Sequence, residues 1–228
     1  MQDIKEYIAL QCRSEFLKDS KKYCSQLKIK ESTAELFEIG IVPEEGLISM
    51  LESAGYSKTE IENLNLSDLK NRFCFPSHTS DGRISAFYFR WSNTSLLQPK
   101  WINQNYIESD LYGIDKCTPD KKYILLCEGV SDTLACAKAG ISNAISKGNF
   151  HFPNDEQTKI LKQFGTVVLA FVNDDCGKKF SEKAKRRLVE NGINTFTLEY
   201  EGRDICEALR DLTQRRLIIN QLKTIMSK

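Results

Sequence analysis

The sequence has few histidines and no long hydrophobic run. Only His78 and His151 occur among 228 residues, so a catalytic triad built on histidine is a poor hypothesis. No stretch approaches the ~18 apolar residues that a membrane-spanning helix needs. The first dozen residues lack the basic segment and apolar core of a signal peptide. We therefore expect no membrane partner and a cytoplasmic location.

Cysteine is present, but not in the spacing that binds zinc. None of the eight cysteines forms a C-x-x-C pair, which argues against a zinc ribbon or zinc finger. Scattered cysteines without an export signal are typical of free thiols in a reducing compartment. The cysteines are Cys12, Cys24, Cys74, Cys117, Cys127, Cys136, Cys176 and Cys206.

An excess of charge of one sign is also missing. The chain has 32 basic and 31 acidic residues and a net charge of +1, so only a local patch could attract nucleic acid. Hydrophobic residues make up 41% and charged residues 28%, which is typical of a globular protein.

The first half of the chain is predicted to be mixed α and β. Residues 3–27 carry apolar side chains at helical spacing, and Ser32, three residues before Glu35, predicts another helix start. Pro43 is expected to open a helix that runs to about residue 54, and a short helix is expected at 58–65. Aromatic residues that alternate around a Ser-Asp-Gly turn predict a β-hairpin between residues 72 and 92.

From residue 122 onward, strands rich in Val, Leu and Ile alternate with helices. This order favours an α/β fold with a mainly parallel sheet and helices on both of its faces. We predict a mixed α+β subdomain over residues 1–118, the α/β domain over 119–210 and a C-terminal helix over 211–228.

Acidic residues follow three of these strands. Glu128 ends the first strand, Asp174 and Asp175 follow another, and Asp204 comes after the last. The carboxyl ends of parallel strands meet at one sheet edge, where such carboxylates would bind Mg²⁺ or Mn²⁺ and support phosphoryl chemistry. The alternative is that these acids only cap helices and occupy turns.

The segments that contain these acids resemble the TOPRIM domain of DnaG-type primases, topoisomerases and some nucleases. They read LLCEGVSDTLA, LAFVNDDCGKK and GRDICEAL. Further upstream, ELFEIGIVP, DGRISAFYFR, QPKWINQN and DLYGIDKC are similar to primase segments, in the same order. The resemblance covers residues 20–210 and identifies a DnaG-type primase catalytic core with a Rossmann-like TOPRIM fold, without the family's zinc-binding domain.

The resemblance implies a role for each acidic residue. Glu128 and Asp174 would be catalytic and would bind metal, and Asp175 and Asp204 would be further metal ligands. Gly129, which is expected to form a tight turn, Asp132 and Gly177 would support them. Two departures from the family pattern stand out: Val172 replaces the first aspartate of the second motif, and Cys206 replaces the second acid of the third.

The resemblance also implies basic residues that hold the phosphates of template and nucleotide. These are Arg83, Arg90, Lys100, Lys116 and Lys178. For Arg83 the alternative is an ordinary charged turn, and for most of the lysines after Gly177 it is a solvated helix face. Trp91 and Trp101 would stack on bases or belong to the core.

The leading hypothesis is an enzyme that makes short RNA primers on single-stranded DNA from NTPs. A replicative helicase or a separate zinc-binding protein is an expected partner, in a bacterial cell and with a phage or mobile element as one origin. Because of Val172 and Cys206, one alternative is a TOPRIM module that binds single-stranded DNA or a helicase without synthesis. A TOPRIM nuclease, which uses the same acids, is another.

Overall fold

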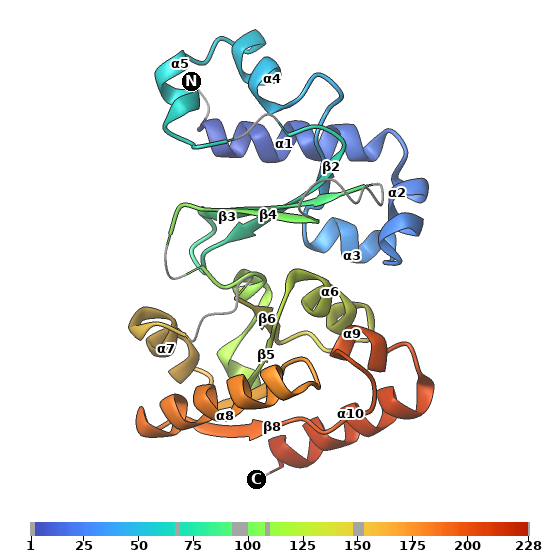
Figure 1. Ribbon diagram of the computed structural model, residues 1–228, viewed down its shortest axis with the longest axis vertical. Helices are drawn as coiled ribbons and strands as arrows, with labels where there is room; N and C mark the ends of the chain where they lie inside the picture. The colour runs from blue at the N-terminus through green and yellow to red at the C-terminus, as the bar shows by residue number, and fades with distance from the viewer. Residues whose placement is uncertain (1–2, 67–68, 93–99, 108–109, 148–152, 228) are drawn as a thin grey trace. The chain divides into compact units, whose positions relative to one another are not determined.

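The computed structural model describes residues 3–66, 69–92, 100–107, 110–147 and 153–227. These residues form two compact units, one from 1–77 with 83–108 and the other from 78–82 with 109–228. Each unit has its own hydrophobic core, as structural domains do. The elements of each unit can be followed by colour and label in Figure 1.

The first unit combines short helices with a four-stranded sheet of order β1-β2-β3-β4. In this sheet β1 pairs antiparallel with β2, and β3 pairs antiparallel with β4. The predicted hairpin is present as β2 and β3. The elements are α1 (Ile4–Leu17), α2 (Ser20–Leu27), α3 (Glu31–Leu36), β1 (Gly40–Ile41), α4 (Leu47–Ser53), α5 (Lys58–Glu62), β2 (Arg72–His78), β3 (Ile84–Trp91) and β4 (Trp101–Asn105).

One close approach fixes α1 against the sheet of this unit. A Cβ atom at Gly40 would lie 2.6 Å from the backbone carbon of Cys12, closer than real Cβ contacts come. Glycine at the start of β1 therefore lets the helix backbone pack directly on the strand, beside the buried Ile8 and Phe16 of α1.

The second unit is a four-stranded parallel sheet of order β6-β5-β7-β8 with helices around it. The predicted mainly parallel sheet is thus confirmed. The elements are the 3₁₀ turns η1 (Ile114–Lys116) and η2 (Pro119–Lys121), followed by β5 (Tyr123–Cys127), α6 (Val130–Lys138), β6 (Ala144–Ser146), α7 (Asp155–Lys162), β7 (Thr166–Ala170), α8 (Asp175–Glu190), β8 (Asn194–Thr197), α9 (Ile205–Ala208) and α10 (Leu212–Met226).

Helices cover both faces of the parallel sheet. Alternate residues of the central strands point to opposite faces, so Leu125 and Val168 pack in one core and Leu126 and Val167 in another. The first core takes its helical residues from α6, α9 and α10, and the second from α7 and α8. Both central strands are therefore buried on both sides, which explains why their sequences are continuously apolar.

The structure divides the chain earlier than the predicted boundary at 118/119. Residues 110–118 belong to the second unit because Tyr112 pairs with Ser146 of β6 in an isolated bridge. The side chain of Asn143 also exchanges hydrogen bonds with the backbone of Thr118. The helix predicted as a separate C-terminal piece, α10, packs into the core of the same unit through Ile218 and Leu222.

Several helices begin elsewhere than the local signals predicted. The helix expected from Pro43 starts at Leu47, after Gly46 with its positive φ of 90°. The helix expected at Ser32 starts at Glu31, without a capping hydrogen bond from a side chain. Start signals thus located these helices to within a few residues.

Candidate active site

The three predicted acidic segments follow three strands of one parallel sheet. Glu128 comes directly after β5, Asp174 lies four residues beyond β7, and Asp204 follows β8 through a short loop. Since β5, β7 and β8 run parallel, all three segments leave the sheet at its carboxyl edge.

Glu128 is half-buried and is tied to the next acidic segment. Its Oε2 accepts a hydrogen bond of 3.4 Å from the backbone N–H of Val172. Burial raises the pKa of the Glu128 carboxyl above its ordinary value; the hydrogen bond from Val172 opposes the rise, and the carboxylates of Asp174 and Asp204 add to it. The pKa of Glu128 therefore depends on the charges of the acidic residues in both neighbouring loops.

Asp174 is the N-cap of α8. Its Oδ1 accepts a hydrogen bond of 2.7 Å from the backbone N–H of Gly177. A Cβ atom at Gly177 would lie 1.9 Å from the carbonyl oxygen of Val172, so only glycine fits this turn. One oxygen of Asp174 therefore caps a helix, as the alternative explanation of these acids predicted. The residue itself is exposed to solvent.

Glu128 and Asp174 line the same pocket, whose volume is about 490 Å³. Its walls are mostly apolar, and Phe171 and Phe180 meet there edge to face with ring centroids 5.3 Å apart. Lys147 adds a basic group, and burial lowers the pKa of its amine. The remaining lining residues are Leu126, Cys127, Pro153, Val172, Cys176 and Gly177.

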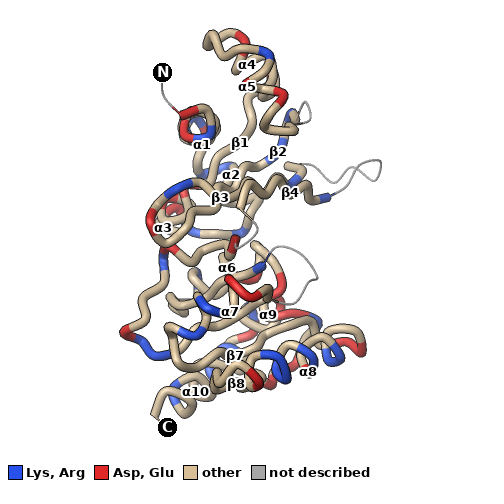
Figure 2. The backbone as a smooth tube through the Cα atoms, turned by 90° about the vertical axis from the view of Figure 1, so that its left-hand side faces the viewer, with Lys and Arg blue, Asp and Glu red and all other residues tan. Residues whose placement is uncertain are grey.

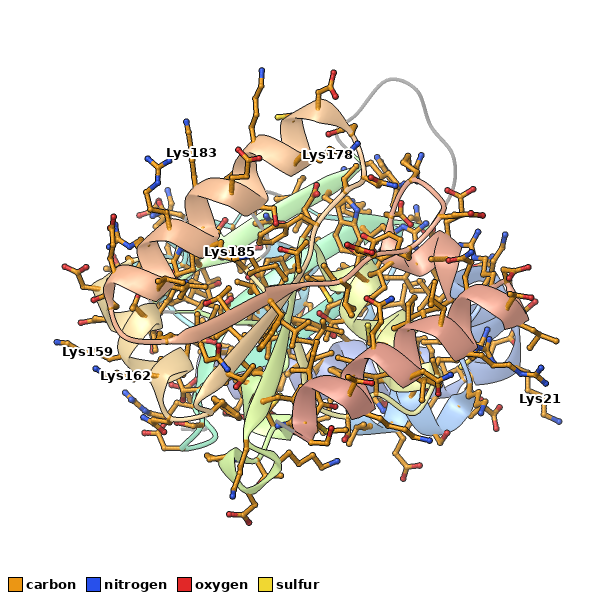
Figure 3. The ribbon with its side chains drawn as sticks, turned by 90° about the horizontal axis from the view of Figure 1, so that it is seen from below. Lys21, Lys159, Lys162, Lys178, Lys183 and Lys185 are labelled. Carbon is orange, nitrogen blue, oxygen red and sulfur yellow. The ribbon has the colours of Figure 1, made fainter. Side chains whose placement is uncertain are left out.

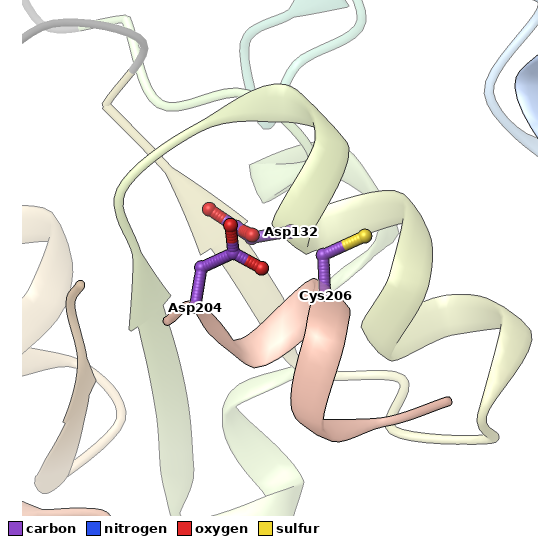
Figure 4. Close-up of side chains that lie close together, drawn as sticks. All are labelled: Asp132, Asp204 and Cys206. Atoms are coloured by element: carbon purple, nitrogen blue, oxygen red, sulfur yellow. The ribbon is translucent and has the colours of Figure 1, made fainter. Parts of the chain in front are cut away.

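A second group lies between α6 and α9, where Asp132, Asp204 and Cys206 each offer a ligand atom (Figure 4). These atoms lie within 4.8 Å of one another. Asp132 is buried and its Oδ2 accepts a hydrogen bond of 3.1 Å from the backbone N–H of Gly129. Burial, reinforced by the charge of Asp204, raises the pKa of Asp132 to about 7.

Asp204 already has partners for both of its oxygens. Oδ1 accepts from the backbone N–H of Glu207 at 2.8 Å, which caps α9. Oδ2 accepts from the guanidinium group of Arg203 at 2.8 and 3.1 Å. Arg203 in turn fixes the neighbouring loop, since its carbonyl oxygen accepts a bond of 2.7 Å from the N–H of Asn173. A cation bound by Asp204 would have to compete with Arg203.

The donor chemistry fits a divalent ion. Glu128 and Asp174 provide carboxylate oxygens around one pocket, the ligand type that Mg²⁺ and Mn²⁺ prefer. The group of Asp132, Asp204 and Cys206 is softer, because one of its three donors is a sulfur. Asp175, the predicted substitute for the missing aspartate, is the exposed first residue of α8 and is not among the described residues that line the pocket.

Gly129 differs from its prediction. It precedes α6 with an extended backbone, φ −137°, and a Cβ atom there would meet only Asp132 Oδ2, at 3.9 Å. The turn after β5 therefore does not require glycine, whereas the turn before Gly177 does.

The predicted phosphate-binding residues are divided between the units. Arg83 is exposed beside the hairpin turn, Arg90 lies over the ring of Trp101 at 5.7 Å, and Lys100 is exposed before β4. The guanidinium group of the buried Arg72 covers Trp91 at 4.4 Å. Residues 98 and 99 of the predicted QPKWINQN segment lie outside the described residues.

The other two predicted basic residues belong to the second unit. The amine of Lys116 forms an ion pair of 2.6 Å with Oδ2 of Asp115. The same oxygen lies 3.8 Å from Nδ1 of His78. Lys178 is exposed in the first turn of α8, four residues after Asp174.

Sequence reasoning missed the residues that hold the acids in place. Neither the pairing of Arg203 with Asp204 nor the hydrogen bond of 2.6 Å from the Tyr200 hydroxyl to the carbonyl of Phe171 was foreseen. The GRD order offered a signal for the first, because adjacent Arg and Asp side chains often pair. The second joins positions 29 residues apart and leaves no local signal.

Comparison with known proteins supports the resemblance. Residues 125–209 match the family model described as Toprim-like. The DNA primase of Staphylococcus aureus (strain COL) is 25% identical over 193 residues, which is 81% of this chain and 30% of that protein. The chain thus spans less than a third of the length of this curated relative.

Solved primase structures have a similar fold over most of the chain. The zinc-binding and RNA polymerase domains of Aquifex aeolicus primase superpose with a TM-score of 0.81 at 23% identity, over 95% of this chain and 60% of that one. The chain has the fold of a DnaG primase catalytic core. A DnaG primase catalytic domain solved with single-stranded DNA gives a TM-score of 0.82 at 16% identity, over 97% of this chain and 77% of that one. The predicted resemblance to the DnaG core is confirmed.

Proposed function

We propose that this protein synthesises short RNA primers on single-stranded DNA templates from NTPs. The observation that carries the proposal is that Glu128 and Asp174, from two separate β–α turns, line one pocket at the carboxyl edge of the parallel sheet. The relatives named DNA primase, and the DnaG catalytic domain solved with single-stranded DNA, support the choice of reaction and template.

In this reaction a primer 3′-oxygen bonds to the α-phosphorus of an incoming NTP, and the bond to pyrophosphate breaks. Glu128 and Asp174 would hold a divalent ion, Mg²⁺ or Mn²⁺, which would stabilise the negative charge of the triphosphate and of the leaving pyrophosphate. Glu128, whose pKa is raised by burial, accepts the proton of the 3′-hydroxyl at one of its carboxylate oxygens. Asp174 is held in position by its hydrogen bond from Gly177.

The basic residues would bind phosphate groups. Lys178, in the first turn of α8, is close in sequence to Asp174 and would reach the phosphates of the NTP. Lys116, Arg83, Arg90 and Lys100 would hold the template backbone through charge and arginine forks. In this assignment Arg90 both covers Trp101 and contacts phosphate.

The partners and setting are proposed with the same function. A replicative helicase would deliver the template, and a separate zinc-binding protein would help to select the start site. The protein would act in the bacterial cytoplasm, encoded by a phage or mobile element. No helix among the described residues is both long enough and apolar enough to cross a membrane.

Two observations favour a second function, a module that binds single-stranded DNA or a helicase without synthesis. Val172 stands where the family has a metal-binding aspartate, and Arg203 occupies an oxygen of Asp204 that would otherwise face a cation. Under this reading the acids serve mainly to cap helices and to pair loops.

An assay of primer synthesis separates the functions. The protein is incubated with single-stranded DNA and labelled ribonucleotides in Mg²⁺ or Mn²⁺, beside a Glu128→Gln variant. The primase proposal expects template-dependent RNA products that the variant does not make. Failure to make any product at high Mn²⁺, with DNA binding retained, refutes synthesis and favours the binding module. Nicking of a supercoiled plasmid that is lost in the same variant identifies the nuclease alternative.

A further inference from the structure

The helix α8 carries a dense row of basic residues, of which the proposed reaction uses only Lys178. Six of the ten residues from 178 to 187 are Lys or Arg, and only Glu182 is acidic, in a chain whose net charge is +1. Figure 2 shows several blue segments along α8. We call the five exposed members the α8 basic face; they are Lys178, Lys179, Lys183, Lys185 and Arg186.

No described residue neutralises the charge of this face through an ion pair. None of its five members forms an ion pair with a residue that the structure describes. The neighbouring Arg187, by contrast, pairs with Asp155 of α7 at 2.7 Å. Two more exposed lysines, Lys159 and Lys162, lie on α7, which covers the same side of the sheet as α8 (Figure 3).

The arrangement costs the helix stability. Lys179 and Lys183 are four residues apart, a spacing at which like charges repel. Lys178 sits in the first turn of α8, where the partial positive charge of the helix end disfavours a cation. A solvated helix face gains nothing from either placement, whereas a polyanion bound along α8 would offset both costs.

The spacing suits a phosphodiester backbone. Lys179, Lys183 and Arg186 follow one another at i, i+4 and i+7, so they form one stripe along the helix. At 1.5 Å per residue this stripe is about 10 Å long. That is roughly the axial length of three nucleotides of one strand of a duplex, at 3.4 Å each.

The surface favours a duplex over a single strand. Proteins bind single strands by stacking bases on aromatic side chains as well as by charge. The one aromatic residue of α8, Phe180, is half-buried and packs against Phe171, so the exposed face offers charge alone. Contacts to phosphates alone are what a duplex with paired bases requires.

We propose that the α8 basic face binds the backbone of the RNA–DNA hybrid that primer synthesis produces. The choice of hybrid rests on the proposed function. Asp174 caps α8, so the basic face begins one turn from the acidic site and leads away from it. Hybrid formed at Glu128 and Asp174 would then be held along α8 as it leaves.

Binding of a preformed hybrid tests this inference without any synthesis. A labelled, blunt RNA–DNA hybrid and a single strand of the same DNA sequence are titrated by fluorescence anisotropy, without NTPs and without divalent ions, over a range of salt concentrations. The test variant is Lys179→Gln with Lys183→Gln and Arg186→Gln. The control is Lys21→Gln with Arg216→Gln and Lys223→Gln, which removes the same charge from exposed positions on α2 and α10. Thermal melting checks that both variants fold.

The inference expects the test variant to lose affinity for the hybrid, with the slope of log K against log salt falling by about 3, one for each phosphate contact. The control should keep the wild-type slope, and affinity for the single strand should change less than affinity for the hybrid. An unchanged slope in the test variant, an equal loss in the control, or an equal or greater loss for the single strand overturns the inference. A wild-type protein that binds hybrid through α8 but makes no primer refutes only the proposed function.

Discussion

The backbone N–H of Val172 donates a hydrogen bond of 3.4 Å to Oε2 of Glu128. The resemblance to primases implies a metal-binding aspartate where this chain has Val172. The chain has no carboxylate at this position, but its backbone contacts the glutamate. Because the main chain makes this contact, it survives a change of side chain at position 172. The hydrogen bond that positions this loop therefore does not depend on whether the side chain at position 172 can bind a metal.

Restoring the missing acid should strengthen metal binding. Val172→Asp adds a carboxylate to a pocket that Glu128 and Asp174 already line. We expect Mn²⁺ affinity, measured by titration calorimetry, to rise by at least about tenfold, the scale on which changes around a metal site act. Val172→Asn, similar in size to aspartate but uncharged, is the control. An equal gain in both variants would contradict a role for the added charge.

Gly177 should tolerate no side chain, whereas Gly129 should. A Cβ atom at Gly177 would overlap the carbonyl oxygen of Val172, while at Gly129 it meets nothing closer than 3.9 Å. Gly177→Ala is expected to lower the free energy of unfolding by at least about 2 kcal/mol. Gly129→Ala should change it by less than about 1 kcal/mol. Urea denaturation measures the free energy of unfolding of both variants. Similar losses of stability in the two would contradict the expected clash at Gly177.

The metal-free protein should lose stability as the pH rises from about 4 to 7. In the unfolded chain Asp132 titrates near its ordinary pKa of about 4. In the folded protein burial raises its pKa to about 7, so between these values the folded state holds the extra proton and higher pH favours unfolding. The effect is at most about 4 kcal/mol.

Two variants isolate this effect. Asp132→Asn should flatten the decline of stability in denaturation curves between pH 4 and 7, while Asp120→Asn, at an exposed position on η2, should leave it unchanged. A decline of the same size in Asp132→Asn would assign the pH dependence to other groups.

Cys206 should give the second acidic group a preference for soft metals. With Cd²⁺ we expect an ultraviolet charge-transfer band from the Cys206 sulfur, because thiolates bind this ion tightly. Cys206→Ser should remove the band, and Cys206→Asp should weaken Cd²⁺ binding and strengthen Mg²⁺ binding. Cys176→Ser, which changes an exposed thiol outside the group, is the control. A wild-type protein without the band, or a band lost only in Cys176→Ser, would contradict the assignment.

The parallel sheet and its acidic edge could be predicted because their signals are local. The strands YILLC and TVVLA are buried on both faces and therefore read as continuous apolar runs, and the acids follow them directly. The helix α8 begins at Asp175, directly after its N-cap Asp174, whose side chain accepts the capping bond from the backbone N–H of Gly177.

The hydrogen bonds that hold the site together could not be predicted, because they join loops that are distant in sequence. The hydrogen bonds from Val172 to Glu128 and from Asn173 to Arg203 depend on the order of strands in the sheet. Nor does any local pattern place residues 110–118 with the second unit, since that depends on the pairing of Tyr112 with Ser146.

The central claim is that Glu128 and Asp174 hold one divalent ion together, and a double-mutant cycle on Mn²⁺ binding tests it most directly. Glu128→Gln and Asp174→Asn remove charge but keep an oxygen that can accept the bonds from Val172 and Gly177, so the loops should stay in place. Titration calorimetry on the wild-type protein, both single variants and the double variant gives the coupling. We predict that each single change weakens the same ion and that the double change costs clearly less than the sum. Losses that simply add, or a Glu128→Gln variant that binds Mn²⁺ as the wild type does, would contradict the shared ion.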